Sequence, residues 1–90
     1  MIQKLLKVKA KRLGASDLRK STRKGKKYMV LYNGRWVHFG AQGYEDYTMH
    51  KDPKRRRAYR ARHGTIRTQQ GKLAYKDPNQ PAYWSWHLLW

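Results

Sequence analysis

Two strand-forming runs that meet at Asn33-Gly34 limit the folds open to this chain more than any other feature. Residues 27–32 and 35–39 are rich in β-branched and aromatic side chains, which favour strands. Asn-Gly is the pair that best tolerates the positive φ angles of a type I′ turn. The sequence therefore predicts a β-hairpin, with Tyr28 opposite Phe39, Met29 opposite His38, Val30 opposite Val37, Leu31 opposite Trp36 and Tyr32 opposite Arg35.

Both faces of this hairpin carry apolar side chains. One face would hold Tyr28, Val30, Val37 and Phe39, and the other Met29, Leu31 and Trp36. A lone hairpin is marginally stable in water, so at least one face must be covered by another element.

A helix is predicted over residues 53–63. Asp52 supplies an N-cap oxygen, Pro53 suits the first helical position, and Gly64 is a suitable stop after His63. A shorter helix within residues 44–51 is a weaker possibility. Residues 64–82 are rich in Gly, Gln, Lys, Asn and Pro and are expected to form a long loop.

The chain ends in the aromatic segment Tyr83-Trp84-Ser85-Trp86-His87-Leu88-Leu89-Trp90. So apolar a segment is expected to pack on the hairpin or into a neighbouring protein. The side chains predicted to anchor a partner are Trp84, Trp86, Leu88, Leu89 and Trp90.

Residues 1–27 carry a net charge of +10 and few apolar side chains, and are expected to form a basic arm. Ile2, Leu5 and Leu6 match the first turns of an amphipathic helix, but Lys9 occupies the next apolar position. The arm could be a solvated tail or a helix that forms on binding. The predicted fold class is α+β: a domain over residues 28–90, in which the hairpin is packed by the short basic helix and the aromatic segment, preceded by this arm.

The net charge of +17 points to an anionic partner. Seven cations lie between Lys51 and Arg62, and arginine suits bidentate contact with phosphate. We expect these residues to bind a nucleic-acid backbone or an acidic protein surface. The predicted binding residues are Lys20, Arg23, Lys24, Lys26, Lys27, Lys51, Lys54, Arg55, Arg56, Arg57, Arg60 and Arg62.

The aromatic side chains allow two interpretations. Rings along a basic surface can stack on unpaired bases. However, Leu, Ile, Val and Phe together number 14, so most of the Tyr and Trp side chains are needed for the core. Trp36 and Tyr44 are the rings whose assignment to the core is least secure.

Several functions find little support. The chain has no cysteine and therefore no disulfide or thiolate zinc site, and no phosphate loop or nucleophile elbow occurs. Glu45, Asp46, His50, Asp52 and His63 could form the site of a metal-dependent nuclease if the fold gathered them. We nevertheless expect a protein that is not an enzyme, with no metal, cofactor or small-molecule substrate. No signal peptide or membrane-spanning run is evident, so a soluble, unsecreted protein is expected.

One stretch of the sequence and the aromatic segment resemble a family of small basic proteins of large DNA viruses and tailed phages. The matching residues are Phe39-Gly40, Gly43-Tyr44, Asp46-Tyr47-Thr48, His50-Lys51-Asp52, Arg55-Arg56, Tyr59, Arg62-His63 and the stretch from Trp86 to Trp90. The resemblance implies a viral origin but no established activity. It suggests a virion role, as a minor capsid or internal protein made in the host cytoplasm that binds the major capsid protein or the packaged nucleic acid. The alternative is an intracellular DNA- or RNA-binding protein.

Overall fold

The hairpin predicted at Asn33-Gly34 forms the centre of the β-sheet. The structure is a computed structural model that describes the backbone of residues 2–90 and the side chains of residues 4–90. Strands β2 (Lys26–Tyr32) and β3 (Arg35–Ala41) pair in the predicted register throughout. Asn33 and Gly34 have φ angles of 52° and 77°, as a type I′ turn requires. The turn residues therefore set the register of the strands.

A helix and a third strand precede this hairpin, where the sequence predicted a basic arm. Helix α1 (Ile2–Arg12) leads into strand β1 (Asp17–Lys20), which pairs antiparallel with β2. Leu6, Ala10 and Leu18 are buried, so residues 2–20 belong to the domain instead of extending from it. Lys9 does not end the helix, because its side chain is exposed beside a narrow stripe formed by Leu6 and Ala10. The side chain of Ile2 lies outside the described residues.

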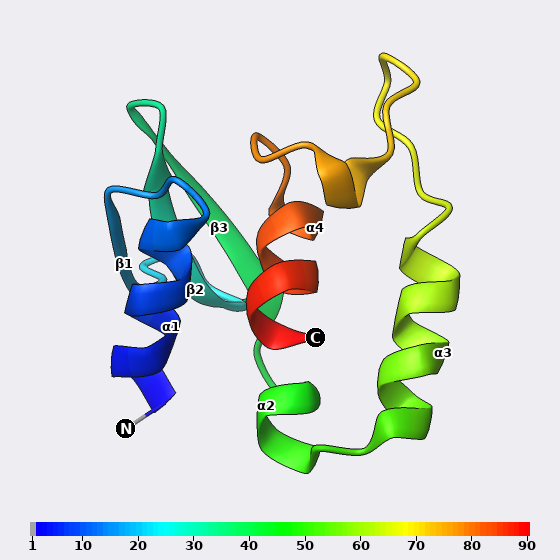
Figure 1. Ribbon diagram of the computed structural model, residues 1–90. Coiled ribbons are helices and arrows are strands. Elements are labelled where there is room, and N and C mark those ends of the chain that lie inside the picture. The colour runs from blue at the N-terminus through cyan, green and yellow to red at the C-terminus, as the bar shows by residue number, and fades with distance from the viewer. Residues whose placement is uncertain (1) are drawn as a thin grey trace.

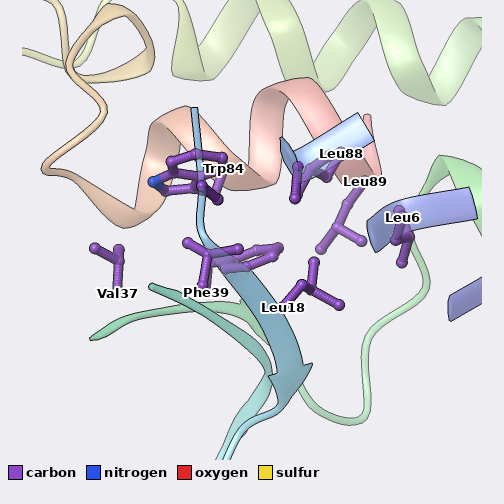
Figure 2. Close-up of a cluster of buried hydrophobic side chains, with 10 residues drawn as sticks. Leu6, Leu18, Val37, Phe39, Trp84, Leu88 and Leu89 are labelled. Carbon is purple, nitrogen blue, oxygen red and sulfur yellow. The ribbon is translucent and has the colours of Figure 1, made fainter. Parts of the chain in front are cut away.

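The aromatic C-terminal segment covers the same face of the sheet as α1. Helix α4 (Pro81–Trp84) continues directly into the π-helix η2 (Ser85–Leu89), and we call the two together the C-terminal helix. Figure 2 shows Trp84 lying over Val37 and Phe39, with Leu88 and Leu89 farther along the helix on the side of Leu6 and Leu18. The expectation that this segment packs on the hairpin is thus confirmed.

Helix α3 (Pro53–His63) has the predicted bounds, and the Asp52 carboxylate accepts a hydrogen bond from the Lys54 N–H at 2.9 Å. The four-residue helix α2 (Tyr47–His50) precedes it. The C-terminal helix lies between the sheet and α3 (Figures 1 and 2), so α3 does not cover the hairpin as expected. The reason is that α3 buries one side chain, Tyr59, which packs on Trp90.

The stretch from 64 to 82 is mostly loop, as expected. It contains a bridge between Arg67 and Leu73 and the 3₁₀ helix η1 (Ala74–Lys76), and α4 begins at Pro81. The whole is a small α+β domain with extents of 35 × 31 × 26 Å. Among the residues described, no helix combines the length and apolar character needed to cross a lipid bilayer.

Candidate nucleic-acid interface

A groove of about 570 Å³ is formed by the sheet, α3 and the C-terminal helix, and we call it the basic groove. Lys26 and Lys27 of β2 line one wall, and Arg55 and Arg62 of α3 line the other. The fold thus brings together four of the predicted binding residues from two distant parts of the sequence. The exposed ring of Tyr44 also lines this groove.

Two of these four cations are paired with acidic side chains. Lys27 Nζ lies 2.6 Å from the Asp46 carboxylate, and both side chains are largely buried. Asp46 also caps α2 by accepting hydrogen bonds from the N–H and hydroxyl groups of Thr48. Arg55 makes a longer and more exposed pair with Glu45, at 3.5 Å. Lys27 therefore stabilises the fold and is a poor candidate for phosphate binding.

Lys26 and Arg62 differ from Lys27 and Arg55. Within the described part of the chain, neither forms an ion pair with an acidic side chain. Arg62 is exposed and Lys26 is half-buried. These two side chains are the best candidates in the groove for contact with a phosphate group.

Arg56 and Arg60 point inward, contrary to their predicted role. Arg56 Nε donates a hydrogen bond to the main-chain oxygen of Trp90 at 2.5 Å, and an Arg60 Nη group donates to the same oxygen at 3.3 Å. Their guanidinium groups also lie over the rings of Tyr47 and Trp86. Burial, and then the charge of Arg56, lowers the pKa of Arg60. Both arginines hold the C-terminal helix against α2 and α3, so their contribution to a binding surface is small.

The remaining predicted binding residues lie outside the groove. Lys51, which follows α2, and Lys54 and Arg57 of α3 are exposed. Lys20, Arg23 and Lys24 are exposed around the turn from β1 to β2. The predicted set is therefore spread over several surfaces.

An aromatic cluster joins α3 to the C-terminal helix. The Tyr59 ring stacks on Trp90 at 4.2 Å and on His63 at 4.1 Å, and lies 6.3 Å from Trp86. Burial raises the pKa of Tyr59, and burial together with the charge of Arg62 lowers the pKa of His63. Trp86 and Trp90 are thus engaged within the chain.

The predicted partner anchors are for the most part internal. Trp84 is fully buried, and Leu88 and Leu89 are each 2% exposed. The Trp84 indole N–H donates to the Pro78 carbonyl at 2.8 Å, so its polar atom also has a partner inside the domain. These three side chains cannot anchor another protein while the domain is folded.

The acidic and imidazole side chains considered for a nuclease have other roles. Asp46 pairs with Lys27, Asp52 caps α3, and His50 Nδ1 accepts the Asp52 N–H at 2.9 Å. Among the residues that the structure describes, no three His, Cys, Asp or Glu side chains are grouped to hold a metal ion. The arrangement gives the nuclease alternative no support.

Some exposed cations were absent from the predicted set. Lys4, Lys7 and Lys11 follow an i, i+3, i+7 spacing, which places them on one exposed face of α1. This spacing could have indicated a shared basic face, but it does so only if the segment is known to be helical. Arg19 is a second case, because it lies on a strand that the sequence did not predict.

A family model described as a family of unknown function (DUF5754) matches residues 16–63, more than half of the chain. The chain belongs to the DUF5754 family. The DUF5754 region contains the sheet, α2, α3 and the four cations of the basic groove. Helix α1 and the C-terminal helix, which cover one face of the sheet, lie outside it. No curated protein and no solved structure shows significant similarity to this DUF5754 chain.

Proposed function

We propose that this chain is a non-enzymatic protein that binds nucleic acid through the phosphate backbone, as a structural component of the particle of a DNA virus or phage. The proposal rests on the uncompensated positive charge of the chain. Across the described residues three ion pairs form, whereas the chain has 22 Lys and Arg and a net charge of +17. A polyanion would relieve the resulting self-repulsion and release counterions on binding.

The burial of the aromatic segment favours nucleic acid over an acidic capsid surface as the partner. Strong protein–protein contacts depend on a few central anchor residues, among which tryptophan is frequent. Trp84, Leu88 and Leu89 are buried in the core of this chain. These three side chains are therefore not available to a partner, whereas many cations are exposed and suit a phosphate backbone.

The basic groove supports a specific part of this interface. Lys26 and Arg62 lie on opposite walls, and Arg62 can make a bidentate contact with phosphate. Lys54 and Arg57 are exposed on the same helix as Arg62. A backbone seated in the groove could continue along α3.

The proposal of a viral setting rests on the resemblance over residues 39–63 and the C-terminal segment. It is tested by locating the chain in purified particles. We expect the chain to be present in purified particles and to be lost together with the genome. Retention on the emptied shell would indicate an acidic capsid partner instead. Presence in infected cells but not in particles would favour the intracellular alternative.

Binding to labelled DNA tests the central claim. Fluorescence anisotropy with a duplex of about 20 base pairs should show affinity falling about 100-fold between about 50 and about 200 mM salt, if four phosphates are contacted. The variant K26Q/R62Q should reduce the slope of log affinity against log salt by about two, or one per lost contact.

The control variant K4Q/K11Q removes the same charge from α1, on the other side of the molecule from α3 (Figure 1). It should change the slope less than K26Q/R62Q does. Equal slopes for the two variants would show that the basic groove has no special role. Salt-independent binding, or no binding at low salt, would contradict the proposed function.

A further inference from the structure

The sheet has a second face that points away from the core. Leu18, Val30, Val37 and Phe39 point toward α1 and the C-terminal helix. Side chains alternate along a strand, so their neighbours lie on the opposite face. We call this opposite face the outer sheet face, and it comprises Asp17, Arg19, Met29, Leu31, Trp36 and His38.

Trp36 is the main aromatic feature of the outer sheet face. Of the four tryptophans, all within the described residues, it is the most exposed, at 39%. It lies opposite the half-buried Leu31, and the Arg19 guanidinium is 5.6 Å from the centre of its ring. In a chain with so few aliphatic side chains, a tryptophan left at the surface is available for recognition.

A cation lies beside this ring. The Arg19 side chain is 64% exposed, so it can turn from Trp36 and Asp17 toward another anion. At the other end of the face, His38 Nδ1 lies 2.7 Å from the Ser21 hydroxyl. The main-chain N–H of Arg23 donates to the same Ser21 hydroxyl at 3.0 Å, so the exposed Arg23 lies beside this end of the face. The exposed ring thus has Arg19 directly beside it, and Arg23 lies at the other end of the same face.

An exposed ring with a cation beside it is suited to single-stranded nucleic acid. Unpaired bases stack on aromatic side chains while nearby cations contact the backbone. In a duplex the base faces are already covered by neighbouring bases, so a ring on a sheet has nothing to stack on. A second copy of this chain is a poor occupant, because each copy carries a charge of +17 and Arg19 lies beside the ring.

We propose that the outer sheet face binds single-stranded nucleic acid, with an unpaired base stacked on Trp36 and the adjoining phosphates contacted by Arg19 and its neighbours. This inference rests on the proposed function and names its substrate: an unpaired strand, bound on a different surface from the basic groove.

The test compares a labelled oligothymidine strand of about 12 nucleotides with a duplex of the same length, by anisotropy at constant salt. Trp36→Ala should weaken binding of the strand by about 5- to 100-fold, which corresponds to the loss of one stacked base. Its effect on the duplex should be less than about threefold. Trp36→Phe should restore most of the strand affinity, because it keeps a ring.

Leu5→Ala is the matched control, since Leu5 is another exposed apolar side chain, at 57%, but lies on α1. It should leave both affinities unchanged. A measurement on the unmodified chain makes the test independent of the folding of any variant. Photocrosslinking to a strand containing 5-iodouracil should label Trp36.

The outcomes separate this inference from the proposed function. If the chain binds the duplex in a salt-dependent manner but Trp36→Ala leaves strand affinity unchanged, only this inference fails. Equal losses for strand and duplex, or self-association that Trp36→Ala abolishes, would also overturn it. If the chain binds neither strand nor duplex, both fail.

Discussion

The rings of Tyr59 and Trp90 lie face to face, with centroids 4.2 Å apart and planes within 5° of parallel. Tyr59 is the buried residue of α3, and the other side chains of that helix are half-buried or exposed. Trp90 follows the C-terminal helix, which packs on the sheet. This stack therefore links the wall of the basic groove that carries Arg55 and Arg62 to the rest of the domain.

Tyr59→Ala should loosen α3 from the domain. Removing a buried aromatic side chain typically costs about 3–5 kcal/mol, and the stacked geometry adds to the loss. Tyr59→Phe keeps the stack and should cost about 1 kcal/mol or less. Urea unfolding followed by circular dichroism measures both values. Equal stability of the Ala variant and the natural chain would show that α3 is held by other contacts.

Gly40→Ala should destabilise the packing between the sheet and the C-terminal helix. Gly40 has a φ of +81°, and an added Cβ would lie 3.0 Å from Leu89 Cδ1 and 3.1 Å from Lys27 Cβ. Strain of this kind costs about 1–3 kcal/mol, and crowding increases it.

Gly43→Ala is a close control for this prediction. Gly43 has nearly the same φ, +83°, but an added Cβ would meet no atom within 4 Å. The difference in unfolding free energy between the two variants therefore isolates the crowding against Leu89 and Lys27. No difference would indicate that the cost at Gly40 is backbone strain alone.

Asp46→Ala should be among the most damaging single changes in the DUF5754 region. Asp46 is 3% exposed, caps α2 and pairs with Lys27 at 2.6 Å. Removing one partner of a buried ion pair costs about 3–5 kcal/mol, because the other charge is left buried. Glu45→Gln disrupts the neighbouring exposed pair with Arg55 and should cost less than about 1 kcal/mol. Chemical denaturation of the two variants measures the contrast, and similar values would show that the Lys27 charge is well solvated.

Local signals in the sequence predicted the hairpin and α3 but not the N-terminal elements. Asn33-Gly34 set the register, and Asp52-Pro53 set the start of α3. By contrast, α1 contributes Leu6 and Ala10 to the core, and β1 contributes Leu18. Such short apolar patterns cannot be assigned to the core from the local sequence, because the residues that cover them lie elsewhere in the chain.

The candidate site was predicted in composition but not in arrangement. Lys26 and Arg62 line one groove although 36 positions separate them, and no local pattern encodes that distance. Arg56 turns inward because its hydrogen-bond acceptor is the main-chain oxygen of Trp90, 34 residues away. Sequence periodicity could not distinguish this arginine from its exposed neighbour Arg57.

The stability of the domain should fall as the pH is lowered below neutrality. Burial lowers the pKa of His38, His63 and His87, with nearby arginines or lysines adding to the effect. The unfolded chain therefore binds more protons than the folded one as the pH falls through the ordinary histidine pKa of about 6.5. Unfolding free energy should consequently decrease from about pH 7.5 to about pH 5.5, and most of the loss should occur below about pH 6.5.

His63→Gln should flatten part of this pH dependence, because the glutamine does not titrate. The effect of His63 can be separated from that of the carboxylates. Arg19 lowers the pKa of Asp17, chiefly through a side-chain hydrogen bond. The contribution of Asp17 to stability is therefore lost only when the pH falls below the usual aspartate range of about 4. Denaturant unfolding at several pH values provides the measurement. If stability were constant or rose as the pH fell from about 7.5 to about 5.5, the histidines would take up their protons as easily in the folded chain as in the unfolded one.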